Sequence, residues 1–489
     1  MTGAKRPKLE LLEPRAVKQI IDEAMNILEE VGVFVENTDG LKLLGGAGAR
    51  VDPTQNRAHI PPNLVERCLK TVPAHIRVYD RDGKLALDLR EDYVHFNPGS
   101  AALRIFDPQL GKPRDARTED LVSLARLVEK LHYFKAQSTA LISSDVPEKM
   151  ADRYRLYISL IYGTKPVITG TFAKEGFAVM HQMLAAVRGG VNQLREKPLA
   201  IFDCCPSPPL KWSDLTCQSL IDCARSGIPA ELVSMPLTGA TSPVTLAGAV
   251  VQHTAENLSG IAIHQLAQPG APIIYGGSPA CFDMRKGTAP MGAVETMMID
   301  VAYSQVGKHL KLPTHAYMAL SDAKSLDAQA GLESGMGAIL AALAGINVVS
   351  GPGMLDFESC QSLEKLVIDN EICGMAYRLA EGIALREKPL AMNILKKIGQ
   401  VDHFLTEAHT LQWFRQEAYF PGPTIDRGTL GEWEEKGKLT AAQRAHQEVE
   451  KILAGAEPKI LPAEIAAEVE GILLADAKKY GLEKLPVSR

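Results

Sequence analysis

Short β-rich runs alternate with longer amphipathic stretches along most of the chain. The first run, YVHFN at 93–97, ends at Pro98 and Gly99, which mark a turn. The later runs follow at fairly regular spacing: YFKAQST from Tyr133, PVITG from Pro166, LAIFD from Leu199, AELVSM from Ala230, PIIYG from Pro272, THAYM from Thr314 and INVVS from Ile346. The hydrophobic pattern therefore predicts eight β-strands.

Stretches with helical periodicity follow the predicted strands. In TEDLVSLARLVEKL, Thr118 is suited to cap a helix, and Glu119 and Asp120 favour its first turn. Eight β-then-α units are what a closed parallel barrel requires. A doubly wound open sheet is the alternative, but no G-x-G-x-x-G motif follows a first strand. We therefore predict an α/β protein built on a (β/α)8 TIM barrel.

The segments on either side of the barrel pattern have a different character. Residues 1–90 contain one long amphipathic helix pattern, PRAVKQIIDEAMNILEEVGV, and short polar segments, which we interpret as an N-terminal helical cap. The barrel pattern occupies 91–388. Residues 389–489 form a C-terminal extension with a polar-faced helix that ends at Gly455. We expect this extension to wrap the barrel or to contact another subunit of a homo-oligomer.

Composition and charge exclude several classes of protein. The 489 residues are 46% hydrophobic and 23% charged, which is typical of a globular protein with a large core. A formal net charge of -5 argues against a nucleic-acid partner. The N-terminus has no apolar h-region, and no run of about 18 apolar residues occurs anywhere. We expect a cytoplasmic protein without a membrane partner, in which the eight cysteines stay reduced.

In a TIM barrel the reactive residues lie at the carboxyl ends of the strands and in the loops that follow them. The positions that this rule selects are mainly aromatic, small or apolar. The predicted substrate-binding set is Phe96, Asn97, Phe172, Tyr275, Tyr317, Ser350, Gly351, Met354 and Phe357. Ring faces attract a cation that lacks hydrogen-bond donors by about 0.5 to 2 kcal/mol each, so the set favours a quaternary ammonium. For any single ring, packing over the apolar core is the more frequent explanation.

His315, Asp322 and Glu333 are the candidate catalytic residues. His315 ends a predicted strand, where it could act as a base, as a hydrogen-bond donor or as a structural histidine. Asp322 and Glu333 lie in the polar segment SDAKSLDAQAGLESG. Ser321 and Asp322 are also suited to cap the helix that this segment begins.

Cysteine positions raise the possibility of a zinc site. Cys204 and Cys205 end one predicted strand and Cys281 follows another, so the three thiols could bind zinc. No His-x-Cys spacing accompanies them, which favours buried thiols and no metal site. The chain also lacks a P-loop, a G-x-S-x-G elbow and an H-E-x-x-H helix.

Five segments resemble the trimethylamine methyltransferase family. They are MPLTGATSPVTLAGAVVQHTAENLSG, QPGAPIIYGGSPACFDMRKG, SDAKSLDAQAGLESG, GPGMLDFESCQSLEKLVIDNEICG and FPGPTIDR, and the likeness runs from roughly residue 10 to residue 455. The resemblance implies a (β/α)8 barrel. Family members demethylate trimethylamine or, in the non-pyrrolysine branch, quaternary amines such as glycine betaine, and they deliver the methyl group to Co(I) of a cognate corrinoid protein.

The archaeal trimethylamine enzymes use pyrrolysine, and this chain has none between Ser321 and Glu333. Pyrrolysine activates a tertiary amine, whereas a quaternary amine departs as a neutral tertiary amine and needs no covalent activation. The resemblance therefore implies that a quaternary amine is the methyl donor, that a separate protein carries the corrinoid (cobalamin), and that no cofactor is bound permanently. Betaine-type members often have a His-Asp pair where this chain has Ser350 and Gly351, which points away from glycine betaine itself.

The mechanism that the resemblance implies is positioning, because holding the two reactants in line supplies much of the rate. Strand-end position then assigns Phe96, Phe172, Tyr275, Tyr317 and Phe357 to the ammonium. Asn97 and His315 would contact a substrate carboxylate, and Asp322 or Glu333 would balance charge. Two alternatives remain open at this point: a zinc-dependent thiol methyltransferase, and a barrel that binds a small molecule without catalysis.

Overall fold

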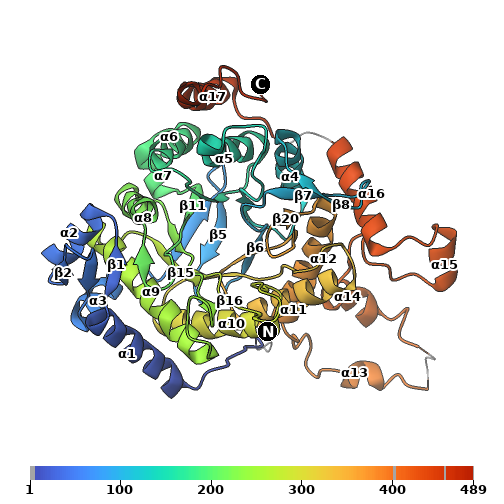
Figure 1. The fold of residues 1–489 in the computed structure, drawn as a ribbon. Helices are drawn as coiled ribbons and strands as arrows, with labels where there is room; N and C mark the ends of the chain where they lie inside the picture. Colours follow the sequence, from blue (N-terminus) through green and yellow to red (C-terminus); the bar gives the residue numbers. More distant parts are fainter. Residues whose placement is uncertain (1–5, 400–402, 456–458, 488–489) are drawn as a thin grey trace.

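The computed structural model describes residues 6–399, 403–455 and 459–487 and contains a (β/α)8 barrel (Figure 1). Its strands are β6 (His95–Asn97), β9 (Gln137–Ser138), β10 (Val167–Gly170), β11 (Ala200–Cys204), β13 (Ala230–Leu232), β15 (Ile273–Gly277), β17 (Thr314–Tyr317) and β18 (Val348–Ser350). Neighbouring strands pair in parallel, and a parallel bridge between Phe96 and Phe134 brings the first strand against the second. All eight predicted strands and the predicted fold class are confirmed.

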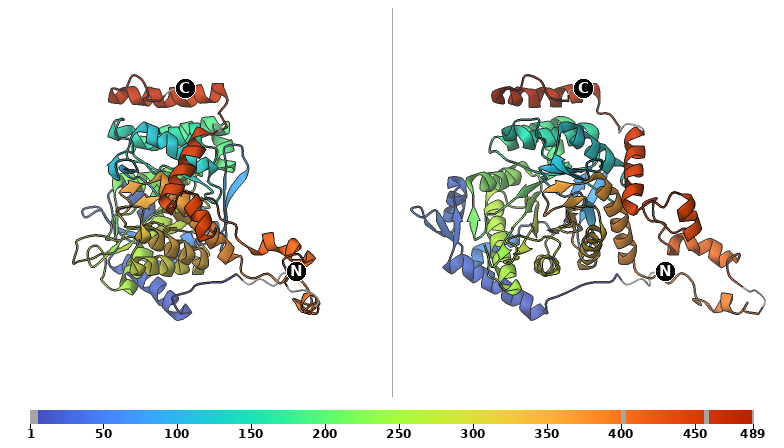
Figure 2. Two further views of the ribbon diagram at one scale, coloured as in Figure 1. Left: turned by 90° about the vertical axis from the view of Figure 1, so that its right-hand side faces the viewer. Right: turned by 45° about the vertical axis from the view of Figure 1, so that its right-hand side comes forward.

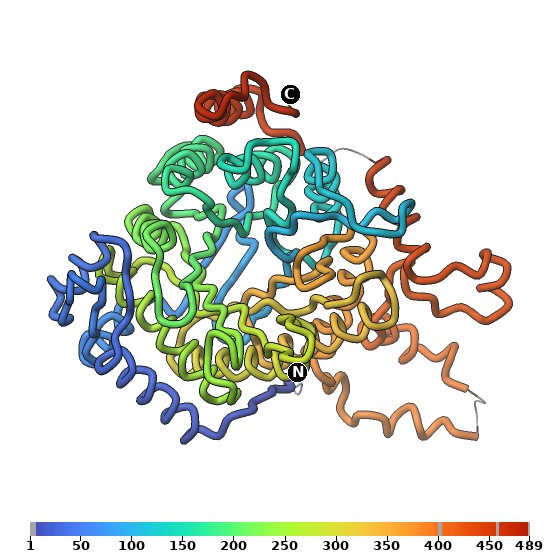
Figure 3. The backbone as a smooth tube through the Cα atoms, in the orientation of Figure 1, coloured from blue at the N-terminus to red at the C-terminus, as the bar shows by residue number. Residues whose placement is uncertain are grey.

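A ring of helices surrounds the strands (Figure 3). One helix follows each strand: α4 (Thr118–Lys130), α5 (Ala151–Tyr162), α6 (Gly176–Arg188), α8 (Asp214–Ser226), α9 (Leu246–Ala267), α10 (Val294–His309), α11 (Ala328–Ala344) and α12 (Leu363–Ala380). α4 begins at Thr118, but its first turn is capped by the Asp120 carboxylate, which accepts the backbone N–H of Arg117 at 2.8 Å. α9 is buried on nearly every face, because the N-terminal segment covers its outer side.

A hairpin closes the amino-terminal end of the barrel. Its strands are β4 (Ile76–Tyr79) and β5 (Leu85–Leu89), and they pair antiparallel. The apolar side chains of the hairpin form one buried cluster with inward residues of five barrel strands or strand ends: Ala136, Ile168, Ile201, Ile274 and Val348. This cluster is the apolar floor of the barrel interior, and the polar positions above it face the opposite end.

The rest of the N-terminal segment lies against the outside of the barrel. α1 (Pro14–Glu30), α2 (Thr38–Gly46) and α3 (Pro62–Leu69) all contact α9. The strands β1 (Val33–Val35), β2 (Arg50–Asp52) and β3 (Arg57–His59) join β12 (Lys211–Trp212) in a four-stranded sheet beside these helices. Among the described N-terminal residues, those of the β4–β5 hairpin form the cluster that fills the end of the barrel.

The C-terminal segment leaves the barrel after α12 and returns to it twice (Figure 2). α13 (Met392–Leu395), α14 (Ala408–Glu417) and α15 (Leu430–Glu435) form a projecting arm on which large apolar side chains such as Leu405 and Leu411 are exposed. α16 (Ala441–Ala454) then packs on α12 and α4, and α17 (Ala463–Ala477) packs on α5 and α6. The predicted helix end at Gly455 is confirmed. Contact between this segment and another subunit stays a prediction.

Two further findings concern the chain as a whole. None of the helices in the described ranges is long and apolar enough to cross a membrane. All eight cysteines fall within those ranges, and each carries a free thiol.

Candidate functional site

The interior of the barrel changes from apolar to polar one step above the floor. Because side chains on a strand alternate between two faces, the residue two positions beyond each floor residue also points inward. Beyond Ile201 this residue is Asp203, and beyond Val348 it is Ser350. The same level holds Glu231 of β13 and His315 of β17, and Tyr317 points inward one step higher. These side chains form the candidate functional site.

A chain of polar contacts crosses this level from β6 to β13. The Asn97 amide donates a hydrogen bond to the Ser350 hydroxyl at 2.9 Å. The Nε2 atom of His315 lies 3.3 Å from that hydroxyl and 3.2 Å from Oε1 of Glu231. Burial lowers the pKa of His315 to about 3. The imidazole is therefore neutral at physiological pH, and it orients its neighbours by hydrogen bonding without adding charge.

Asp203 and Glu231 form a buried pair of carboxyl groups. Burial raises the pKa of Glu231 well above its usual value, and the adjacent charge of Asp203 raises it further. Burial also raises the pKa of Asp203 to about 6, although the hydrogen bond from Glu231 and the charge of Arg155 oppose that rise. Two adjacent buried carboxyl groups resist carrying two negative charges, and Glu231 is the member whose pKa is raised further, so the pair favours a single charge on Asp203.

A cavity of about 230 Å³ opens above this pair at the carboxyl end of the strands. Its wall includes the carboxyl groups of Asp203 and Glu358, the guanidinium of Arg155 and the rings of Phe172 and Tyr317. A larger hollow of about 540 Å³ lies at the opposite end of the barrel, against residues that precede the strands. The smaller cavity is the candidate substrate site, because TIM barrels carry their active sites at the carboxyl end.

Arg155 is the cation in the cavity wall. It comes from α5, and its Nη1 atom donates to the backbone oxygen of Thr139 at 2.6 Å. The guanidinium also lies 4.4 Å from the centre of the Phe172 ring. Burial lowers the pKa of Arg155 to about 10, so the group stays protonated at neutral pH. One face of Phe172 therefore already contacts a cation of the protein.

Phe96 and Tyr275 lie away from the cavity, which differs from the expectation that they would surround the substrate. Phe96 packs edge-on against Tyr377 of α12 at 5.3 Å between ring centres. The Tyr275 hydroxyl donates to the hydroxyl of Thr254 on α9 at 3.0 Å. Both rings are fully buried between the strands and the helices. Each is adjacent in its strand to a residue that points inward, so its own side chain points outward and packs against the helices.

The predicted residues after β18 divide between packing and the site. Ser350 belongs to the polar chain described above, and Gly351 follows it with a φ of +151°, where a side chain would collide with the backbone of Met318. Met354 is buried and packs over Gly99. The ring of Phe357 lies 3.7 Å from the ammonium of Lys324, so a cation of the protein occupies its face.

Asp322 and Glu333 connect two loops beside the cavity. The Asp322 carboxylate accepts the backbone N–H groups of Met291 at 2.9 Å and Gly292 at 2.8 Å. Oε2 of Glu333 accepts the Ser321 hydroxyl at 2.5 Å and the Asp322 N–H at 2.8 Å. Both carboxylates thus hold the loop after β17 in place, and α11 is capped by Asp327 instead. A catalytic role for the two acids stays a prediction, as does one for His315.

Four residues of the site are missing from the predicted sets: Asp203, Glu231, Arg155 and Glu358. Asp203 ends the predicted strand LAIFD, so its position was the signal. Glu231 gave a usable signal, because a carboxyl group in the middle of an apolar strand is rarely buried without a partner or a function. Arg155 gave none, because nothing in a helical stretch marks which charged side chain points inward. Glu358 lies in the loop after β18, next to Phe357 in the sequence, but its carboxyl group reaches the cavity wall and the ring does not appear there.

The three thiols considered as zinc ligands are not gathered together. Cys204 points outward from β11 toward Cys223 of α8, and the Cys281 sulfur accepts a hydrogen bond from Thr238 at 3.4 Å. Within the described residues, no group of three or more His, Cys, Asp or Glu side chains is arranged to hold a metal ion.

Gly276 provides a test of how tightly this polar level is packed. A Cβ atom there would lie 2.8 Å from the Cβ of His315 and 2.8 Å from the carbonyl oxygen of Leu232. Gly276→Ala is expected to destabilise the protein by about 1 to 3 kcal/mol, because neither neighbour can move freely. The measurement is the free energy of unfolding in urea. Gly331→Ala in α11 is the control, since its Cβ would meet nothing within 4 Å. That variant should be up to about 1 kcal/mol more stable than the wild type; equal stability of the two variants would contradict the tight packing.

Comparison with known proteins places this geometry in context. Residues 2–477 match the model of a family described as trimethylamine methyltransferase. The chain is 30% identical to the trimethylamine methyltransferase MttB of Desulfitobacterium hafniense, over 94% of this chain and 92% of that one. It is also 30% identical to a glycine betaine methyltransferase from the same species, over 98% and 100%. Identity to MttB of Methanosarcina barkeri is 32%, over 95% of each chain.

A solved structure agrees on the fold. The monomethylamine methyltransferase of Methanosarcina barkeri superposes with a TM-score of 0.51 at 12% identity, over 95% of this chain and 87% of that one. At this identity the likeness bears on the architecture alone.

Proposed function

The chain belongs to the trimethylamine methyltransferase family, and from that premise we propose that it moves a methyl group from a quaternary or other methylated amine to Co(I) of a cognate corrinoid protein. The observation that carries the proposal is the acidic wall of the cavity. Asp203 and Glu358 place two carboxyl groups in this wall, with Glu231 behind Asp203, against the single guanidinium of Arg155. Buried carboxyl groups in excess favour a cationic ligand.

The size of the cavity supports a small donor. Its volume of about 230 Å³ lies below the range of roughly 300–1,000 Å³ that is typical of pockets for drug-sized ligands. A methylated amine fits a space of this kind, and a corrinoid ring does not. We therefore place the acceptor outside, at the mouth of the barrel, where a separate corrinoid protein would dock and supply the nucleophile that takes the methyl group.

The residues of the wall would act by binding and orienting the amine. Asp203 and Glu358 would hold the cationic nitrogen from below and from the side, so that one methyl group faces the mouth. A quaternary amine leaves as a neutral tertiary amine and requires no proton from the protein. This agrees with a neutral His315, whose pKa of about 3 excludes an imidazolium at physiological pH.

The relatives include proteins named for trimethylamine and for glycine betaine. The direct test supplies the purified chain with cob(I)alamin, or with a corrinoid protein encoded beside it, and a panel of amines. The visible spectrum reports formation of methylcobalamin. We expect a quaternary amine from the panel of choline, tetramethylammonium and betaines to react. If trimethylamine donates its methyl group and none of the quaternary amines does, the leaving-group argument is overturned. If no amine donates a methyl group, the proposed function is overturned.

A further inference from the structure

The turn that carries Glu358 has an unusual backbone. It joins β19 (Met354–Leu355) to β20 (Cys360–Gln361), and the φ angles of Asp356, Phe357 and Glu358 are +52°, +55° and +64°. Three successive residues with side chains thus occupy the left-handed region, which is unfavourable for each of them. In the ranges that the structure describes, no other non-glycine residues do so consecutively. Such strain persists only where the surrounding structure enforces it.

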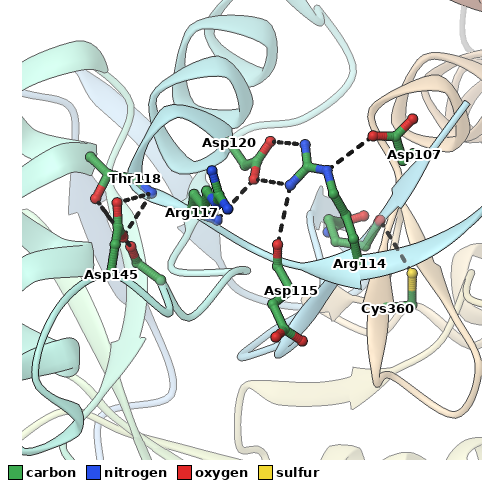
Figure 4. A network of polar contacts seen from close by, with 10 residues as sticks. Asp107, Arg114, Asp115, Arg117, Thr118, Asp120, Asp145 and Cys360 are labelled. Atoms are coloured by element: carbon green, nitrogen blue, oxygen red, sulfur yellow. Dashed lines mark hydrogen bonds and ion pairs between the residues drawn. The ribbon is translucent and has the colours of Figure 1, made fainter. Parts of the chain in front are cut away.

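The surroundings of the turn do enforce it. The Asp356 N–H donates to the carbonyl oxygen of Ala323 at 3.0 Å, and the Asp356 carboxylate pairs with Lys324 at 3.0 Å. β19 and β20 belong to a four-stranded sheet with β7 (Arg104–Asp107) and β8 (Lys112–Asp115). Arg114 of β8 binds Asp107 at 3.0 Å and Asp120 of α4 at 2.7 Å, which fastens the sheet to the barrel helices (Figure 4).

The result of this arrangement is a half-buried glutamate whose inner carboxyl oxygen has no partner. Glu358 lines the cavity, and its Oε1 atom is buried with no hydrogen-bond partner among the described residues. Nor does any cation of the described chain lie within ion-pair distance of the carboxyl group. Lys324 is held by Asp356, and Arg155 is held by the backbone of Thr139 and the ring of Phe172.

The ionisable groups around Glu358 are mostly acidic. The groups that interact with it or line the same cavity are Asp203 and Cys205 at the end of β11, Tyr317 of β17, Asp322 after β17, Asp300 of α10 and Arg155 of α5. Glu231 of β13 and His315 of β17 lie next to these groups but outside the wall of the cavity. Burial raises the pKa of Glu358 to about 8, and the charges of Asp203 and Asp322 contribute to the rise. A carboxyl group in this position is mostly protonated at neutral pH, and a cation that enters the cavity favours its ionised form.

Resting on the proposed function, we propose that Glu358 is the counter-ion of the substrate's cationic nitrogen and that binding of this cation expels a proton from Glu358. The strained turn exists to bring the carboxyl group to the cavity, and the missing partner is the ligand. Glu358 is thus a residue that determines specificity for a cation over a neutral molecule of the same shape.

The sign of the pH dependence follows from the raised pKa. Below pH 8 the free protein holds Glu358 protonated, so a cation must displace the proton before it can pair. Affinity should therefore fall by about tenfold for each pH unit below 8 and become flat above it. Four neighbouring groups have pKa values at or outside the limits of the range from pH 6 to pH 8. The pKa is about 6 for Asp203 and for Asp322, about 3 for His315 and about 10 for Arg155. Burial raises the pKa of Glu231 and of Asp300 as well, so the assignment of this titration to Glu358 is tested by the Glu358→Gln variant.

Isothermal titration of the full chain with choline tests the coupling without catalysis. At about pH 7, runs in two buffers with different heats of ionisation should reveal release of close to one proton per choline bound, and at about pH 9.5 release of none. The neutral carbon isostere of choline, dimethylbutanol, should bind without proton release. Proton release that is absent at both pH values, or that is equal for choline and dimethylbutanol, would overturn the proposal.

Glu358→Gln tests the residue, because glutamine keeps the shape of the side chain and removes the titration. The variant should bind choline about 100-fold more weakly than the wild type at pH 9 and should lose the pH dependence below 8. The matched control is Glu364→Gln, which changes a buried glutamate that pairs with His446 at 2.9 Å and does not line the cavity. We expect the control to keep the wild-type profile; loss of the pH dependence in both variants would refute the assignment to Glu358.

The result for Glu358 and the result for the proposed function are separable. Cation binding with proton release but no methyl transfer to any acceptor would uphold the role of Glu358 and reject the transfer reaction. Methyl transfer from a quaternary amine whose affinity does not change between pH 6 and pH 8 would uphold the transfer reaction and reject the role of Glu358.

Discussion

Asp203→Asn is expected to lower kcat/KM for a quaternary amine by at least about 30-fold. Asp203 is the ionised member of the buried pair at the base of the cavity, and its pKa of about 6 keeps it charged at neutral pH. Removing one member of a buried charge interaction costs about 2 to 5 kcal/mol, which corresponds to a factor of roughly 30 or more. The loss arises because the ligand cation then meets a neutral amide in place of a carboxylate and pairs with Glu358 alone.

The measurement is steady-state methyl transfer with a matched control. Asp222→Asn makes the same chemical change on α8, outside the barrel, where the carboxylate accepts a hydrogen bond from Gln218 at 2.9 Å. We expect that variant to retain kcat/KM within about twofold, as is usual for substitutions away from a site. Asparagine at position 203 is nearly isosteric, so the melting temperature should change little. Wild-type activity of Asp203→Asn would remove the acidic pair from the proposed mechanism.

Arg153→Leu is expected to destabilise the folded chain by about 3 to 5 kcal/mol, because it leaves two carboxylates buried without their cation. Arg153 on α5 is fully buried. Its Nη1 atom lies 3.1 Å from Asp152, and its Nε atom lies 3.0 Å from Asp476 of α17. Asp152 also accepts the backbone N–H of Phe172 at 2.7 Å, so the cluster links the C-terminal helix to the loop beside the cavity.

Urea unfolding followed by circular dichroism measures this effect. Lys479→Ala provides the control, because Lys479 contacts the same Asp476 at 3.0 Å but is 67% exposed. Exposed ion pairs contribute about 0 to 1 kcal/mol, so this variant should unfold almost like the wild type. The double variant Arg153→Leu and Asp476→Leu should recover part of the loss, since one unpaired charge is removed. Arg153→Leu and Lys479→Ala with the same stability would show that the buried cluster contributes nothing.

The alternation of β-rich and helical runs determined the fold class. Few folds bury eight β-rich runs that are each bounded by turn residues or by a helical stretch. The parallel barrel is the fold among them that is built from eight strands. The strand at 93–97 and the helix that ends at Gly455 were both predictable for local reasons, since turn residues and helix ends depend on neighbours in the sequence.

The direction in which each strand side chain points was decided by the tertiary structure. Strands of a parallel barrel are buried on both faces, so their sequences lack the alternation of polar and apolar residues that would mark the inner face. Phe96 and Tyr275 therefore look like rim residues in the sequence but lie against helices. Asp203 and Glu231 come together because adjacent strands bring them side by side.

The partners of the charged residues also depended on the tertiary structure. Asp322 is satisfied by backbone N–H groups about thirty positions earlier in the chain, and Arg153 by an aspartate near the C-terminus. Glu358 has no such partner, although its sequence neighbourhood is as polar as theirs. The sequence alone determined the barrel and the end of it that carries the site, because these follow from local periodicity. Which carboxyl groups remain free to bind a ligand depends on contacts between residues distant in the sequence, and only folding creates those contacts.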